Sequence, residues 1–201
     1  MDFIDFRDSF GPVPAHRHIN PNGGKGGWVA DAAQVSAQAT IGESVRVASG
    51  ATILDQVYIV GHAQIMGSAT VMEHAKIGGF AVIGDCAVVG GNAEVWDNAT
   101  IGGSAAVLDK AEVLGNAKIE GCAKIQGRAK VYGYAQVRDH AVVGGTAVVA
   151  GKAVLAGNVR CNAGKIIAGE RRGRQNRLDT EVSLAQQNIV SVVELDDEIG
   201  I

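Results

Sequence analysis

The sequence predicts an all-β protein in which short parallel strands stack as the coils of a β-helix, with a short extension at each end. Three observations predict this class. An aliphatic residue recurs at every sixth position from Val29 to Leu155, and an alanine or valine follows each of them four positions later. Aromatic residues make up only 4% of the 201 residues, so the interior must be narrow.

A period of six fits neither a helix nor one long strand, and it predicts a coil with three flat sides. Within Thr100–Ala105, the side chains of the first three residues alternate out, in and out, as in a strand. Gly103 and Ser104 then turn the chain. Because so short a side cannot pair with itself, it must pair with the side three repeats later. Residues 28–159 therefore form about seven coils of 18 residues.

The segments on either side of the repeat differ from it in composition. Residues 1–27 are rich in turn-forming residues and predict an N-terminal arm or cap, with Trp28 at the open first coil. The register ends after Val159, so residues 160–201 are expected to form a C-terminal extension or cap. The segment from Thr180 onward has apolar residues at helical spacing and also a stretch rich in β-formers, so helix and strand both stay open.

Overall charge and composition exclude several classes of protein. A formal net charge of −3 gives no strong attraction to nucleic acid or to an anionic membrane, so neither partner is expected. The chain has no run of 18 apolar residues, and its first ten residues lack the apolar core of a signal peptide. Three cysteines, an odd number, favour a reducing compartment. We therefore expect a cytoplasmic location.

The repeat unit itself resembles a known superfamily. The hexapeptides "EVLGNA" (112–117) and "KVYGYA" (130–135) place glycine two residues after the aliphatic residue. This pattern is similar to the x-V-x-G-x-A variant of the hexapeptide-repeat, left-handed parallel β-helix proteins. That variant occurs in bacterial and prophage proteins that are called transferases without a demonstrated substrate. The resemblance implies the left hand, since the usual crossover rule favours right-handed connections. It also implies a place in the phage particle if the chain is prophage-encoded.

The resemblance suggests histidines as candidate catalytic residues. Acyltransferases of this superfamily use a histidine as general base in a groove between subunits, with acetyl-CoA as the acyl donor. Here His74, His62 and His140 are the candidates, in that order, and each follows an aliphatic residue by three positions. The 18-residue coil puts them on three different corners. They are either such bases or ordinary exposed corner residues. The array also lacks the loop insertion with which family enzymes build part of their site.

Cysteine and histidine patterns give weaker hypotheses. Cys122 and His140 lie one coil apart on the same corner, which is either an activated thiolate pair or an accidental one. Cys161 takes the next inward position of the register and should be packed. His16 and His18 form an H-x-H pair in a loop-like segment. The zinc-binding spacing of the γ-type carbonic anhydrases is absent, so no metal and no resident cofactor are expected.

Two of the three outward faces carry apolar stripes, which need a cover on a soluble rod. The first stripe contains Tyr58, Val60, Trp96, Leu114 and Tyr132, and the second contains Leu54, Met72 and Leu108. Beside the first stripe, Lys76 with Glu94 and Glu112 with Lys130 should form ladder pairs of opposite charge. We expect a homo-oligomer, and the resemblance implies a trimer of parallel rods. A protein partner could bind the terminal segments.

Basic residues suggest one further site. Lys118, Lys124 and Lys130 surround one coil, with Arg128 nearby, and form either an anion-binding site or a solvated ring of charge. The run "ERRGRQNR" at 170–177 is expected to be a solvated linker. Three functions stay open. A rigid oligomeric scaffold or binding protein without catalysis is favoured over an acyltransferase, and over a protein that binds anions or nucleotides in grooves between subunits.

Overall fold

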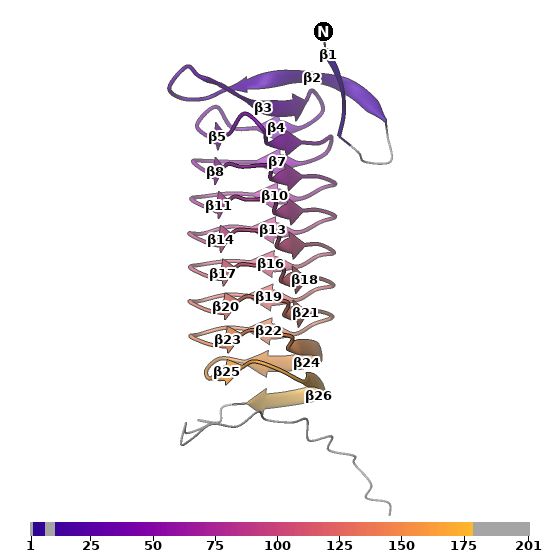
Figure 1. Cartoon of the computed structure of the whole chain (residues 1–201), viewed down its shortest axis with the longest axis vertical. Coiled ribbons are helices and arrows are strands. Elements are labelled where there is room, and N and C mark those ends of the chain that lie inside the picture. The colour runs from indigo at the N-terminus through magenta and orange to yellow at the C-terminus, as the bar shows by residue number, and fades with distance from the viewer. Residues whose placement is uncertain (1, 7–10, 179–201) are drawn as a thin grey trace, which may run out of the picture.

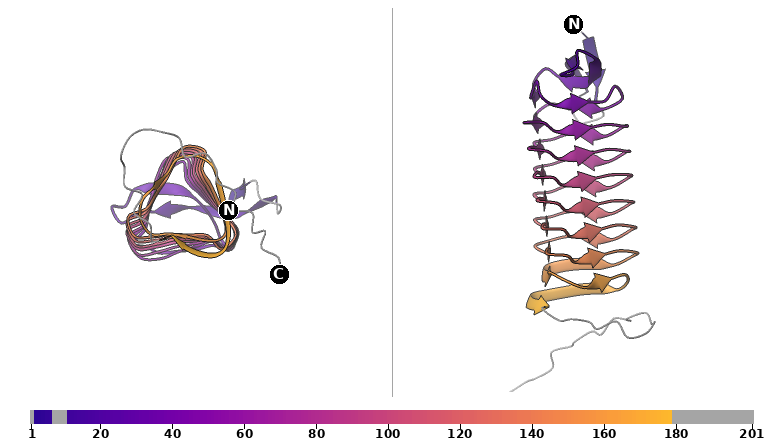
Figure 2. Two further views of the ribbon diagram at one scale, coloured as in Figure 1. Left: turned by 90° about the horizontal axis from the view of Figure 1, so that it is seen from below. Right: turned by 90° about the vertical axis from the view of Figure 1, so that its left-hand side faces the viewer.

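A computed structural model of the chain describes residues 2–6 and 11–178 and shows a three-sided coil of parallel strands (Figures 1 and 2). The prediction of an all-β parallel solenoid is confirmed, since the described residues contain strands and no helix. Seen along its axis, the coil is triangular (Figure 2). We name its three flat sides 1, 2 and 3, in the order in which the chain visits them. The left hand of the coil stays a prediction from the resemblance.

Most strands are two residues long, and each side is a ladder of them. Side 1 contains β4 (Gln34–Val35), β7 (Thr52–Ile53), β10 (Thr70–Val71), β13 (Val88–Val89), β16 (Ala106–Val107), β19 (Lys124–Ile125) and β22 (Val142–Val143). Side 2 contains β5 (Thr40–Ile41), β8 (Tyr58–Ile59), β11 (Lys76–Ile77), β14 (Glu94–Val95), β17 (Glu112–Val113), β20 (Lys130–Val131), β23 (Val148–Val149) and β25 (Lys165–Ile166). Side 3 contains β3 (Lys25–Ala30), β6 (Arg46–Val47), β9 (Gln64–Ile65), β12 (Val82–Ile83), β15 (Thr100–Ile101), β18 (Lys118–Ile119) and β21 (Gln136–Val137).

The hexapeptide produces this geometry as the sequence predicts. Ile101 points inward from β15 and is fully buried, and Ala105 fills the narrow space inside the following corner. Ile101 pairs in parallel with Ile83 on one side and with Ile119 on the other, 18 residues away in each direction. The buried aliphatic and alanine residues form one continuous core along the axis. Each coil therefore holds the next one both through backbone bonds and through apolar contact.

At the corner position two residues after the inward aliphatic residue, most repeats have either glycine or an acidic residue, and the backbone geometry of the corner explains this choice. The corner residue has a positive φ, which glycine adopts without strain, as Gly103 does at +63°. Six corners instead have an acidic residue at positive φ: Asp55, Glu73, Asp85, Asp97, Asp109 and Asp139. Each of these carboxylates accepts a hydrogen bond from the backbone N–H of the corner residue 18 positions later. The Asp85 carboxylate, for example, lies 2.7 Å from the nitrogen of Gly103.

The N-terminal arm is a cap made of antiparallel strands. β2 (Pro12–Ile19) pairs with β1 (Asp2–Asp5) on one edge and with β3 on the other, and it crosses the first coil (Figure 1). Phe6 is buried in an outer cluster that includes Ala30 and Ala48 of side 3. The cap therefore contacts both the end of the coil and one of its flanks.

Three side chains of the cap bond the backbone of β5, the first strand of side 2, or of the residues beside it. Asn20 donates to the carbonyl oxygen of Ile41 and accepts from its N–H. His18 bonds the carbonyl of Ala39, and Arg17 bonds the carbonyl of Glu43. These backbone groups lie on the edge of the sheet, where no earlier coil pairs with them. The side chains of the cap thus take the place of a missing strand.

At the other end, the coil continues past Val159, where the sequence pattern stops. β24 (Val154–Cys161) runs from side 3 to side 1, and β26 (Glu170–Leu178) pairs with it in parallel. Ile166 pairs with Val149 and Glu170 pairs with Val154, so the spacing shortens from 18 residues to 17 and then to 16. Side 2 consequently has eight strands, one more coil than the sequence predicts.

This extra coil corrects two expectations. The run at 170–177 is part of β26, not a linker, because its backbone pairs with the preceding coil. The coil also continues beyond Val159, although the sequence repeat ends there. The choice between helix and strand for the last segment lies outside the described residues. In the part of the chain that is described, no helix could span a membrane.

Candidate functional site

The three candidate histidines lie on three separate corners of the rod. His62 follows side 2, His74 follows side 1 and His140 follows side 3, and all three are exposed. The His62 ring stacks on Phe80, one coil further on, with 5.0 Å between the ring centroids. Within residues 2–6 and 11–178, no side-chain hydrogen bond orients any of these three imidazoles. One subunit therefore does not bring them together.

The cysteine and histidine pairs have ordinary structural surroundings. Cys122 and His140 lie on adjoining corners, since the Cys122 N–H donates to the carbonyl of Asp139. Cys161 is buried as predicted, and this burial raises the pKa of its thiol. His16 is exposed and bonds Asp31, whereas His18 is buried in the cap. No group of three potential metal ligands forms among the described residues.

The four cations of the expected anion site do not converge. Lys118 lies on β18 of side 3, Lys124 on β19 of side 1 and Lys130 on β20 of side 2. Arg128 occupies the corner between Lys124 and Lys130. Lys130 is already paired with Glu112, at 2.8 Å. Arg128 borders both side 1 and side 2, but the three lysines lie on three different sides, so this ring of charge offers no single pocket.

Side 2 carries the first apolar stripe, and its largest side chain lies flat. The Trp96 ring covers Gly78 of the preceding coil, because a Cβ on Gly78 would meet this ring at 2.1 Å. The indole N–H of Trp96 donates to the Glu94 carboxylate. Trp96, Leu114 and Tyr132 are consequently half-buried, whereas Tyr58 is exposed. The result is a shallow, mostly apolar surface and not a deep groove.

Ion pairs border this stripe at the expected places. Lys76 bonds Glu94 at 3.0 Å and Lys130 bonds Glu112 at 2.8 Å, which confirms both predicted ladder pairs. The hydrogen bond from Lys76 is the main reason that the pKa of Glu94 lies below its ordinary value. The border of the stripe is therefore close to neutral.

The second apolar stripe is partly closed by its own residues. Met72 and Leu108 approach Gly90 from the two neighbouring coils, within 3.1 and 3.5 Å of where a Cβ would stand. Leu54 is half-buried one coil earlier on the same side. Side 1 thus has less open apolar surface than the sequence suggests.

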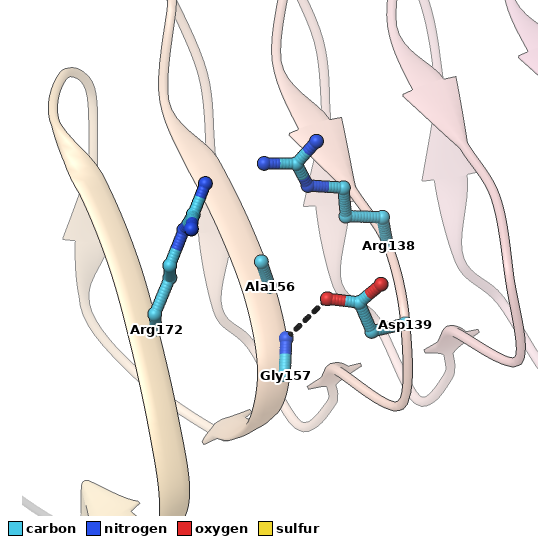
Figure 3. Close-up of a pocket in the computed structure, with 5 residues that line it drawn as sticks. All are labelled: Arg138, Asp139, Ala156, Gly157 and Arg172. Carbon is cyan, nitrogen blue, oxygen red and sulfur yellow. Dashed lines mark hydrogen bonds between the residues drawn. The ribbon is translucent and has the colours of Figure 1, made fainter.

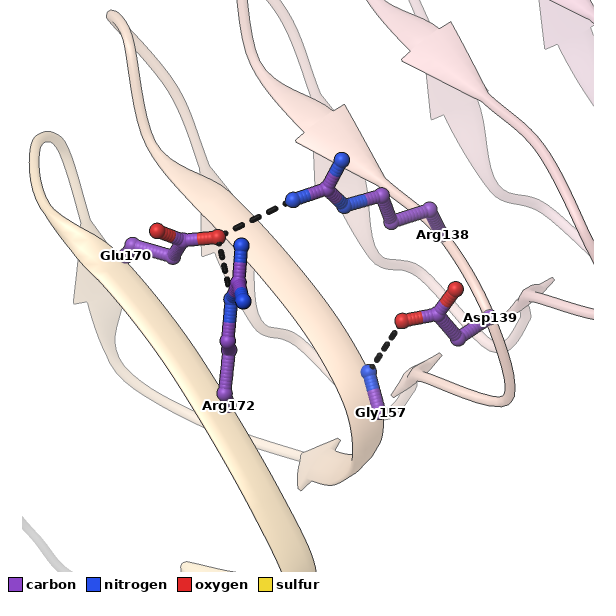
Figure 4. Close-up of polar contacts among 5 residues, drawn as sticks. All are labelled: Arg138, Asp139, Gly157, Glu170 and Arg172. Atoms are coloured by element: carbon purple, nitrogen blue, oxygen red, sulfur yellow. Dashed lines mark hydrogen bonds and ion pairs between the residues drawn. The ribbon is translucent and has the colours of Figure 1, made fainter.

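A hollow at the C-terminal end of side 3 was not expected from the sequence. It has a volume of about 280 Å³ and is lined by Arg138, Asp139, Ala156, Gly157 and Arg172 (Figure 3). The Glu170 carboxylate bonds Arg138 at 3.0 Å and Arg172 at 2.6 Å (Figure 4). The hydrogen bond from Arg172, followed by that from Arg138, holds the pKa of Glu170 below its ordinary value.

The charges of this hollow are largely balanced. Asp139 also accepts the N–H of Gly157 (Figures 3 and 4), so each carboxylate here has a partner. The cluster fastens the last strand to the coil before it. The sequence does not predict this cluster. Arg138 and Arg172 come to lie two coils apart on the same side only because the spacing between paired residues shortens after Val159.

Comparisons with known protein families, with curated proteins and with solved structures find no match to this chain. The observations that bear on function are therefore those of the fold and of its surfaces.

Proposed function

We propose that the protein is a rigid, self-associating scaffold whose subunits meet through side 2. The distribution of exposed apolar side chains carries this proposal. Among the described residues, six large hydrophobic side chains are exposed, and four of them lie on side 2 or on the corner that follows it. These four are Tyr58, Phe80, Tyr134 and Ile167. Aromatic residues are enriched where protein surfaces bind one another.

The architecture of side 2 suits a contact between flat surfaces. Trp96, Leu114 and Tyr132 form a half-buried strip along successive coils. The Lys76–Glu94 and Lys130–Glu112 pairs leave little net charge beside it. Burial of such a strip removes apolar area from water and leaves no unpaired charge behind.

Stiffness supports the role of a scaffold. The core of fully buried aliphatic and alanine residues runs without interruption from Ala39 to Leu155, and each coil bonds the next. Three parallel copies are the assembly that the hexapeptide-repeat resemblance suggests. An acyltransferase needs an oriented base as well as a donor site, and no observation on His62, His74 or His140 favours that alternative.

The test is the mass of the particle in solution, measured by light scattering at micromolar concentration. We expect three times the 20.7 kDa of one chain. Trp96→Glu should shift the mass toward one chain, because a carboxylate would be buried against apolar neighbours. Leu108→Glu is the matched control on side 1 and should leave the mass unchanged.

Each other outcome has a definite meaning. A wild-type mass of 20.7 kDa would exclude self-association. Dissociation by Leu108→Glu instead of Trp96→Glu would place the contact on side 1. Calorimetric binding of acetyl-CoA that is lost in His74→Ala would contradict a role without catalysis.

A further inference from the structure

The charge of this rod is strongly separated along its axis. Residues 1–117 contain twelve acidic and six basic residues, whereas residues 118–178 contain twelve basic and three acidic residues. The remaining 23 residues contain six acidic residues and no basic ones. The whole-chain value of −3, which argues against a nucleic-acid partner, therefore averages over a coil segment of formal charge +9.

Each coil adds a fixed rise along the axis, so residues 118–178 occupy one continuous length of the rod. It begins at β18 and includes the remaining coils as far as β26. On sides 2 and 3, three of its cations are already matched, whereas exposed Lys118, Lys152 and Lys165 form no ion pair within the described residues. Lys130 pairs with Glu112, while Arg138 and Arg172 share Glu170.

On side 1, no cation is in an ion pair with any residue that the structure describes. Four exposed residues on side 1 and its following corner form what we name the basic strip: Lys110, Lys124, Arg128 and Arg160. Within the described residues, none of the four side chains forms an ion pair or a hydrogen bond. From Lys124 to Asn162, neither side 1 nor the corner after it carries a carboxylate. Asp109, next to Lys110, is a carboxylate on the first corner of the strip, and it accepts the backbone N–H of Gly127. These cations are held on a stiff surface and are free to bind an anion.

The spacing of the strip fits a linear ligand. Lys124 pairs with Val142 and Val142 with Arg160, so the two cations stand two coil steps apart, roughly 10 Å. Lys110 and Arg128 lie on adjoining corners, one step or about 5 Å apart. Exposed Gln126, Thr146 and Asn162 add neutral hydrogen-bonding groups between them. Cations repeated along a line match a polymer of phosphates better than one small anion.

We propose that the basic strip binds the phosphate backbone of a nucleic-acid duplex without reading its sequence. Cationic side chains on a duplex backbone release condensed counterions, which supplies affinity without base contacts. Side 1 offers no aromatic ring from Lys124 to Asn162, so it lacks the stacking surfaces that bind unpaired bases. The strip reaches the corner between sides 1 and 2 but includes no residue of the apolar stripe on side 2, so this inference does not rest on the assembly through that side.

Fluorescence anisotropy with a labelled duplex of about 20 base pairs tests the proposal on the full chain, at low and at moderate salt. The wild type should bind, and its affinity should fall steeply as salt is added. The double variant Arg128→Gln/Arg160→Gln should bind at least about tenfold more weakly at low salt. Its dependence on salt should also be shallower by about one in slope for each cation removed.

The matched control is Lys25→Gln/Lys118→Gln, which removes two exposed positive charges from side 3 and should leave duplex affinity nearly unchanged. Circular dichroism and light scattering on each variant would show that fold and mass are retained. Four results would each overturn the inference. These are no duplex binding by the wild type, affinity independent of salt, equal weakening by the control, or tighter binding of single strands or heparin than of the duplex. A change of mass in the Arg128/Arg160 variant would assign the strip to assembly instead.

Discussion

The two ends of the solenoid protect their outermost coils in different ways. At the N-terminal end, an antiparallel strand crosses the coil, and the side chains of Arg17, His18 and Asn20 bond backbone groups in or beside the first strand of side 2. At the C-terminal end, β26 continues the parallel ladder, and exposed ion pairs to Glu170 fasten it from outside. Side chains thus close the sheet edge at the N-terminal end, whereas at the C-terminal end an irregular extra coil is fastened over the regular ones.

This difference decides which end should depend on individual residues. Bonds from a partly buried amide cannot be replaced by water without cost, whereas exposed ion pairs contribute little. Single substitutions should therefore damage the N-terminal end far more than the C-terminal end.

The largest effect is expected at Asn20. Asn20→Ala removes both bonds to Ile41 and leaves a backbone donor and a backbone acceptor without partners, so stability should fall by about 2–4 kcal/mol. Urea unfolding measures this loss. Asn22 bonds only the exposed N–H of Gly24, so Asn22→Ala is the control and should cost less than about 1 kcal/mol. Equal losses would mean that the amide of Asn20 does not replace a strand.

A substitution in the middle of the rod gives the reference for both ends. Ala105→Leu overpacks a fully buried corner and should destabilise the protein by about 1–3 kcal/mol. Ala106→Lys, one residue later and pointing outward, should stay within about 0.5 kcal/mol. Similar melting temperatures for the two variants would show that the inward and outward positions are assigned the wrong way round.

A smaller effect is expected at the corner carboxylates. Asp85→Ala keeps the positive φ, which alanine disfavours, and removes the bond to the N–H of Gly103, so about 1–2 kcal/mol should be lost. Asp85→Asn should lose less, because asparagine tolerates this φ and retains an acceptor oxygen. If the asparagine variant is as unstable as the alanine variant, the charge of the carboxylate is the important feature.

The smallest effect is expected on the stability of β26, at the C-terminal end of the rod, when the pH is lowered. The pKa of Glu170 is lowered in the folded chain, so its ion pairs stabilise the fold above the ordinary pKa of a glutamate. That contribution is lost as the pH falls below about 4 and through the lowered pKa. Hydrogen exchange, corrected for intrinsic rates, should then show β26 opening before β3. Glu170→Gln should remove this pH dependence, and an unchanged acid response in that variant would rule out Glu170 as its source.

Much of the fold was predictable because a constant period is a strong constraint. The inward Ile101 and Ala105, the buried Cys161 and both lysine–glutamate ladder pairs are all placed by counting in steps of 18. After Val159 the steps become 17 and 16, and the count fails although backbone pairing continues. Hydrogen bonds between strands require alignment in space and not equal spacing in sequence.

The surfaces were less predictable than the core. The sequence shows that Trp96 faces outward, but it does not show that the ring lies down over Gly78, because this depends on the rotamer and on the neighbouring coil. The three lysines do surround one coil as counting predicts, but one lies on each side, and whether they bind an anion stays a prediction. Counting charge by segment, and not over the whole chain, would have revealed the basic half from the sequence alone.

The corner carboxylates have a consequence for how such a chain can change over time. Each one bonds a backbone N–H of the next coil, a group that every amino acid except proline provides. A glycine corner can therefore become an aspartate corner without any matching change in the neighbouring coil. Whole coils can likewise be gained or lost in evolution while the remaining carboxylate-to-backbone bonds between coils still form. Only proline lacks the backbone N–H that such a bond needs, and all three prolines of this chain, Pro12, Pro14 and Pro21, precede the first coil.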